Sequence, residues 1–206
     1  LDSSSSGSFN VAIGHNALTV CSVSNNTAVG YECLKANTTG TDNTAVGANS
    51  LDANTTGQAN NAIGKNALGV NTTGNYNQAI GRECLDANTE GDFNVGVGHA
   101  ALSSNTTGDN NIGIGFDALV DNTTGNNNIC IGKNAGRSTS PSGTLSTSSN
   151  NICLGDNNIS NFFCADTSIS SSDSRDKTDI TDFSIGLKWI EALRPVTYRW
   201  DRRTWY

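Results

Sequence analysis

A repeat of 17 residues runs through most of this chain and constrains its fold more than any other feature. An aliphatic residue followed by glycine recurs eight times, first at an interval of 16 residues and then six times at 17. A ninth copy ends at Gly155, after a 23-residue interval that contains an insertion. Such self-similarity is typical of solenoids, in which like coils stack on one another. The eight glycines are Gly14, Gly30, Gly47, Gly64, Gly81, Gly98, Gly115 and Gly132.

Other positions keep the same register. An asparagine stands four residues before each repeat glycine, and a leucine stands four residues after seven of them, from Leu18 to Leu119. The coils are joined by Asn-Thr-Thr-Gly segments, with Asn-Thr-Glu-Gly as a variant at Asn88. The stretch around each aliphatic-Gly pair predicts a short strand, and the joining segment predicts a turn.

The composition alone would suit a disordered chain, since only 35% of the residues are hydrophobic. Disorder does not explain why the few apolar residues keep a fixed register. The sequence therefore predicts an all-β fold over residues 1–170, a parallel β-solenoid or β-roll of about nine 17-residue coils. Asparagines of successive coils are expected to stack in ladders.

Alternation along each strand separates two faces. We expect the aliphatic column that runs from Val29 to Ile131 to form the coil interior together with the leucines. The opposite face carries Ala, Gly or Cys, from Ala28 to Cys153, and is expected to contact partner chains. Because one chain has few large apolar residues, the sequence predicts a homotrimer.

Several classes of function find no support in the sequence. A formal charge of −7 without a basic stripe argues against nucleic-acid binding, and no apolar run is long enough for a membrane helix. His15 and His99 lie in a variable column, so no metal site or cofactor is expected. No paired carboxylates recur in a common column, so the repeats carry no sign of a turnover enzyme.

The cysteines are interpreted from their columns. Cys33 and Cys84 replace alanine, and Cys130 and Cys153 lie in the small-residue column, so all four are predicted to be buried, reduced thiols. Cys130 and Cys153 remain the best candidates for a disulfide, since they would lie on successive coils. Asn-Thr-Thr also matches a glycosylation sequon, but turn formation accounts for it.

The composition changes near Ser170, and all three tryptophans follow it. Ser184 can cap a short amphipathic helix that Pro195 ends, and alternation from Val196 to Trp200 predicts a strand. A second, small α+β domain is therefore expected to begin here, over residues 171–206.

Two resemblances follow from these motifs. Asn10-Val-Ala-Ile-Gly and its copies resemble the head repeats of trimeric autotransporter adhesins, and the Asn-Thr-Thr-Gly units resemble repeats that precede phage tail-fibre chaperones. Ser172-Asp173-Ser174-Arg175-Asp176-Lys177 and the later Leu193-Arg194-Pro195-Val196 resemble the self-cleaving intramolecular chaperones of endosialidase type.

The second resemblance implies a homotrimeric viral tail fibre or spike, located on the virion, that attaches to a host-surface glycan or protein. A cellular surface adhesin with the same chaperone is the alternative. By position, Ser172 would be the nucleophile, Lys177 the general base and Asp173 a supporting residue of a single-turnover autoprotease. The cut would fall between Ser171 and Ser172. The competing interpretation is that Ser172 begins a linker and Lys177 is a surface charge.

Overall fold

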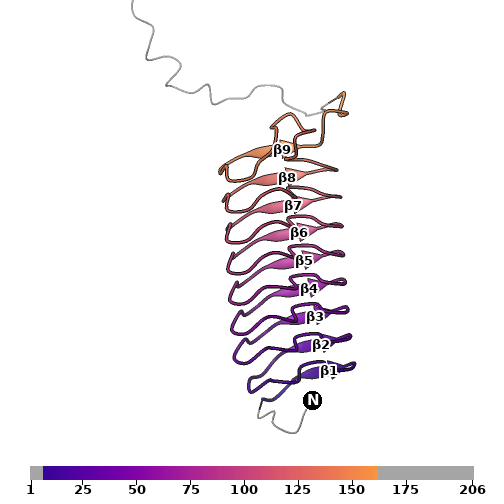
Figure 1. Cartoon of the computed structure of the whole chain (residues 1–206), viewed down its shortest axis with the longest axis vertical. Coiled ribbons are helices and arrows are strands. Elements are labelled where there is room, and N and C mark those ends of the chain that lie inside the picture. The colour runs from indigo at the N-terminus through magenta and orange to yellow at the C-terminus, as the bar shows by residue number, and fades with distance from the viewer. Residues whose placement is uncertain (1–6, 162–206) are drawn as a thin grey trace, which may run out of the picture. The chain divides into compact units, whose positions relative to one another are not determined.

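A computed structural model describes residues 7–161 of the chain. This part is all-β and contains no helix, so none that could cross a membrane. Nine three-residue strands form one parallel sheet in sequence order, each stacked on the one before it (Figure 1). The strands are β1 (Val11–Ile13), β2 (Thr27–Val29), β3 (Thr44–Val46), β4 (Asn61–Ile63), β5 (Gln78–Ile80), β6 (Val95–Val97), β7 (Ile112–Ile114), β8 (Ile129–Ile131) and β9 (Ile152–Leu154).

The strands pair in register, so each residue lies beside its equivalent in the next coil. The 17-residue spacing relates the seven strands β2–β8, while β1 precedes by 16 residues and β9 follows by 23. The predicted parallel β-solenoid is thus confirmed, although the regular coils number about seven rather than nine. The expected second domain, residues 171–206, lies outside the described residues.

Each strand ends at the repeat glycine for a steric reason. Gly64, for example, has φ +138°, and a Cβ atom there would clash with the carbonyl oxygen of Gly81 in the next coil. Only glycine satisfies both the backbone conformation and the close approach. The glycine therefore sets the end of the strand in each coil on which another coil is stacked.

The coil interior is filled by leucine and by small side chains. All seven repeat leucines are fully buried, and so are the alanines at the middle of β2, β3, β4 and β5. The leucines adopt left-handed backbone angles, such as φ 51° at Leu68, which is costly for a residue with a Cβ. Burial of the leucine side chain, which is worth about 1.5–3 kcal/mol, offsets that cost. The buried leucines are Leu18, Leu34, Leu51, Leu68, Leu85, Leu102 and Leu119.

Two ladders of buried asparagines complete the interior, as the sequence predicted. In the first, each Oδ1 accepts a bond from the backbone N–H of the next asparagine, as in Asn77 N to Asn60 Oδ1 at 2.9 Å. In the second, the side chains bond directly, as in Asn71 Nδ2 to Asn54 Oδ1 at 2.9 Å. The same Nδ2 also donates to the carbonyl of Gly74 in its own turn. Both ladders therefore satisfy amides that burial would otherwise penalise.

Candidate assembly surface

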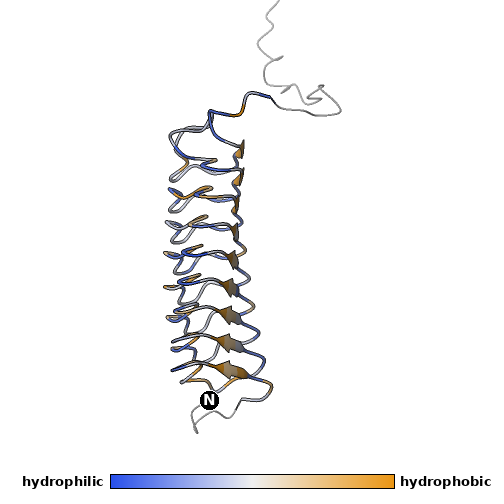
Figure 2. Cartoon of the chain, turned by 90° about the vertical axis from the view of Figure 1, so that its right-hand side faces the viewer, coloured by the Kyte–Doolittle hydropathy of each residue, from blue (hydrophilic) through white to orange (hydrophobic). Residues whose placement is uncertain are grey.

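The outer face of the sheet carries an aliphatic column along its whole length. The third residue of every strand points away from the coil interior and is half-buried or exposed. Ile63 and Ile80, for instance, keep 42% and 44% of their surface exposed. Figure 2 shows these hydrophobic strands following one side of the stack. The column consists of Ile13, Val29, Val46, Ile63, Ile80, Val97, Ile114, Ile131 and Leu154.

This arrangement reverses the predicted facing. The small-residue column, expected to contact partner chains, is the interior one, and the Val and Ile column, expected inside, faces outward. The middle of each strand from β2 to β9 holds only Ala, Gly or Cys, because the interior has little space there. At Gly113 an added Cβ would already meet Leu102 Cγ at 3.1 Å, and at Gly96 it would clash with Cys84 Sγ. The leucine prediction was correct.

The first residue of each strand also faces outward, beside the aliphatic column. No charged residue and no histidine occurs in either column from β1 to β9. We call the two columns together the outer stripe. Within it the third-residue column is aliphatic throughout; monomeric soluble proteins rarely expose such a continuous apolar band, and such bands mark interaction surfaces. The first-residue column consists of Val11, Thr27, Thr44, Asn61, Gln78, Val95, Ile112, Ile129 and Ile152.

Two further columns border the outer stripe. The leading edge, two residues before each strand, consists of Phe9, Asn25, Asp42, Ala59, Tyr76, Phe93, Asn110, Asn127 and Asn150. The trailing edge, two residues after each strand, consists of His15, Tyr31, Ala48, Lys65, Arg82, His99, Phe116, Lys133 and Asp156.

Aromatic rings stack along both edges between neighbouring coils. On the leading edge, Tyr76 and Phe93 are parallel, with ring centroids 5.0 Å apart. On the trailing edge, His99 stacks on Phe116 at 5.2 Å. Arg82 Nη2 donates to His99 Nε2 at 2.7 Å, which places the proton of a neutral His99 on Nδ1. The two edges thus carry aromatic and charged side chains, whereas the stripe between them carries only uncharged, non-aromatic ones.

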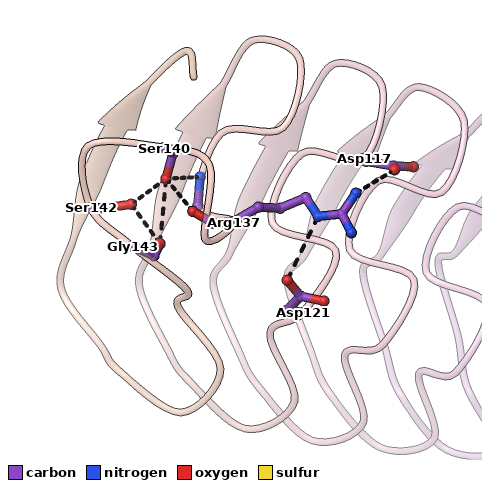
Figure 3. Close-up of polar contacts among 7 residues, drawn as sticks. Asp117, Asp121, Arg137, Ser140, Ser142 and Gly143 are labelled. Carbon is purple, nitrogen blue, oxygen red and sulfur yellow. Dashed lines mark hydrogen bonds and ion pairs between the residues drawn. The ribbon is translucent and has the colours of Figure 1, made fainter. Parts of the chain in front are cut away.

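The insertion before β9 is fixed to the earlier coils by ion pairs. Arg137 contacts Asp117 at 2.8 Å and Asp121 at 3.7 Å (Figure 3). The Ser140 hydroxyl accepts a bond from the N–H of Gly136 and donates to the carbonyl of Arg137, which closes the loop on itself. The insertion therefore lengthens the last coil without interrupting the sheet.

The cysteines lie where their columns predicted. Cys33, Cys84, Cys130 and Cys153 are buried, and all are free thiols in the structure. Burial raises the pKa of Cys84 and of Cys130 to about 12, and that of Cys33 to about 11. For Cys153 burial also disfavours the thiolate, but hydrogen bonds from Ser142, Ser140 and the Gly136 backbone prevail and lower its pKa.

Comparison with known families finds a match to residues that follow the solenoid in the sequence. Residues 172–204 match a family described as chaperone of endosialidase. Neither a curated protein nor a solved structure matches the chain. The match covers the segment for which the sequence motifs indicated the same resemblance, and we call it the chaperone segment.

The predicted site residues Ser171, Ser172, Asp173 and Lys177 lie outside the described residues. The chaperone match begins at Ser172 itself, the residue assigned as nucleophile. Within residues 7–161, no group of three or more His, Cys, Asp or Glu side chains is arranged to hold a metal ion. The described part of the chain therefore offers one candidate site, the outer stripe with its two edges.

Sequence reasoning missed this surface because it assigned the aliphatic column to the interior. A count of interior positions could have revealed it. Each coil from β2 to β7 already has one leucine, two small residues and two asparagines in its interior. Seventeen residues that enclose those side chains leave no space for another large one.

Proposed function

We propose that the chain forms the shaft of a homotrimeric fibre or spike, whose C-terminal segment is the start of an intramolecular chaperone. The observation that carries this proposal is the outer stripe, which is aliphatic or uncharged over nine strands. Its half-exposed side chains form a band that a single chain leaves in water, and association would remove that band from solvent.

Threefold symmetry explains why the stripe lacks charge. Around a threefold axis between parallel copies, a residue near the axis meets its own equivalents from the other two chains. A charged residue there would face two like charges in a dry interface, whereas valine or isoleucine packs against itself. The absence of charge from both columns is what such an axis requires.

The chaperone segment supports the assignment to a fibre. We propose a viral tail fibre or spike on the virion, with the solenoid as a structural or host-attachment segment. A receptor would be a glycan or protein of the host surface. The role of the chaperone would be to align the three parallel solenoids in register before their apolar faces meet.

We further propose that the chaperone releases itself after assembly. Ser172 Oγ attacks the carbonyl carbon of Ser171, while neutral Lys177 accepts the hydroxyl proton and delivers it to the departing amine. Asp173 supports this pair. Water then hydrolyses the resulting ester, which leaves one fragment ending at Ser171 and another beginning at Ser172.

Trimerisation is tested by Ile80→Lys, with Thr73→Lys as the control. Ile80 lies in the outer stripe and Thr73 on an exposed turn, so neither change disturbs the coil interior. Sedimentation equilibrium at micromolar concentration should give a trimer for wild type and Thr73→Lys, and a folded monomer for Ile80→Lys. A wild-type monomer, or a trimer in all three, would reject the stripe as the assembly surface.

Self-cleavage is tested separately by mass spectrometry of the chain with its complete chaperone domain. Wild type should yield a fragment ending at Ser171, while Ser172→Ala and Lys177→Ala should stay intact and still trimerise. Cleavage in Ser172→Ala would leave Ser172 as an ordinary linker residue.

A further inference from the structure

The two edges of the outer stripe differ in chemistry at the same height of the solenoid. On the leading edge, the stacked rings of Tyr76 and Phe93 precede β5 and β6, and remain 49% and 52% exposed. On the trailing edge, Arg82 and His99 follow the same two strands. The Arg82 side chain is 57% exposed. An aromatic pair and a cationic group thus occupy opposite ends of two neighbouring rungs.

The edges also differ in charge over their length. In the described chain the leading edge has no Lys or Arg, and it carries Asp42, with Asp92 beside Phe93 and Asp109 beside Asn110. The trailing edge carries Lys65, Arg82 and Lys133, and no carboxylate until Asp156. Glu83 lies next to Arg82, with its Oε2 3.6 Å from Nη2. This partly exposed ion pair is weak, and together with the 2.7 Å bond to His99 it leaves more than half of the Arg82 side chain exposed to a partner.

Cyclic symmetry brings unlike edges together. When three copies turn their flat faces to a common axis, the trailing edge of each copy meets the leading edge of the next, at the same height. Such a contact is heterologous, so it can pair different residues, unlike the contact at the axis. The level of β5 and β6 then places a cation opposite exposed rings.

We propose that Arg82 of one copy packs on the Tyr76–Phe93 pair of the next copy and closes each of the three corners of the trimer. The inference rests on the proposed trimer and names the contact that orients its chains. A guanidinium over an aromatic ring is favourable, more so when water is excluded, and Asp92 beside the rings adds a complementary charge. A second copy of this chain is the occupant, because both halves of the contact lie on one chain at matching rungs.

The contact also specifies direction. An antiparallel neighbour would present its trailing edge to the trailing edge of the first copy, because turning a chain over also reverses its strand direction, so Arg82 would not meet the Tyr76–Phe93 rings. The aromatic pair is confined to two coils in the middle of the stack, so only parallel chains in register align it with Arg82. The edges therefore distinguish the correct register, which a uniform aliphatic stripe cannot do.

Disulfide trapping tests the corner directly. In the double variant Arg82→Cys/Phe93→Cys the two sites lie at opposite ends of two neighbouring three-residue strands, β5 and β6, each about 10 Å long, so one chain cannot bridge them. Mild oxidation of the full chain should give covalent dimers and trimers on a non-reducing gel. Each single variant, and Arg82→Cys/Thr73→Cys as the control on a distant turn, should give monomer bands.

The outcomes separate the corner from the trimer itself. Sedimentation of the same samples reports assembly before oxidation. A trimer whose double variant yields only monomer bands overturns the corner contact and leaves the proposed trimer standing, and so does cross-linking in the Arg82→Cys single variant. Absence of a trimer in wild type removes both. Arg82→Gln should weaken assembly about tenfold in its midpoint concentration, and Lys133→Gln should change it less than threefold.

Discussion

Asn122 is the last member of its ladder, because Leu145 occupies the place in the following coil where the six coils from Asn37 to Asn122 have an asparagine. The equivalence follows from the backbone, since Thr123 N–H bonds to the carbonyl of Ser146 as Thr106 N–H does to that of Thr123. Asn122 Oδ1 is buried, and no hydrogen-bond donor reaches it within the described residues. The insertion thus ends the ladder with an unused acceptor.

This arrangement predicts that a polar substitution of the buried Leu145 is tolerated. Leu145→Asn should change the free energy of unfolding by less than about 1 kcal/mol, because a new amide bond to Asn122 offsets the lost apolar burial. Leu68→Asn places the same change in the leucine column, where no ladder acceptor waits, and should cost more than about 3 kcal/mol. Urea unfolding at fixed protein concentration measures both. Equal losses would contradict the ladder assignment of position 145.

The ladders also predict a strong response to a single carboxylate. In Asn71→Asp the donor to Asn54 Oδ1 and Gly74 O is lost, and oxygens face oxygens in a buried site. We expect a loss of about 3 kcal/mol or more at pH 7. Burial raises the pKa of the new carboxyl above its unfolded value, so the deficit should shrink as pH falls towards about 4. Asn110→Asp, at an exposed site, is the control and should be nearly neutral throughout.

Removing the charge of Asp86 is expected to stabilise the fold. Burial, and then the nearby Glu83, raise the pKa of the Asp86 carboxyl. Its charged form therefore destabilises the fold at neutral pH, and that cost disappears as pH falls below the unfolded value. Asp86→Asn should stabilise the protein at pH 7 by less than about 1 kcal/mol, since the group is partly solvated, and should have no effect near about pH 3. Denaturant unfolding across this range, with exposed Asp42→Asn as the reference, checks the sign.

The cysteine environments predict an order of reactivity. Cys153 accepts hydrogen bonds that lower its pKa, whereas burial holds the pKa of Cys33 at about 11 and of Cys84 at about 12. Iodoacetamide at pH 8 should label Cys153 before Cys33 and Cys84 in the native protein, because the thiolate is the reactive form. Peptide mass spectrometry over time measures this, and urea-unfolded protein should label all sites alike. Earlier labelling of Cys84 would refute the assigned environments.

The sequence was sufficient for the fold because its constraints are repeated. The glycine at the end of each strand, the buried leucine and the asparagine ladders all follow from a period that any one coil would leave ambiguous. The direction of the strand side chains did not follow. Alternation separates Ala28 from Val29 but leaves open which of them is inside, and that depends on how little space the coil encloses.

The role of the edge residues could not be predicted from the repeat, for a different reason. Tyr76, Arg82 and Phe93 lie in columns whose residues vary from coil to coil. An interpretation based on repeated positions gives such residues no weight. Their meaning depends on which residues share a rung, and on which end of the strand each occupies. Both depend on the three-dimensional path of the coil, which the sequence pattern alone does not give.

The in-register ladders have a consequence for how such a chain changes over generations. Every regular coil offers its neighbours the same glycine, leucine and asparagine contacts, so a coil gained or lost by recombination leaves the remaining joints intact. Length would then vary in steps of about 4.8 Å without a new fold having to be found. The aromatic pair at β5 and β6 does not share this freedom, since a coil inserted between these strands would separate the stacked rings of Tyr76 and Phe93. The length of the fibre is thus set by the glycine, leucine and asparagine columns of the repeat, and the contacts between its chains by the edge columns.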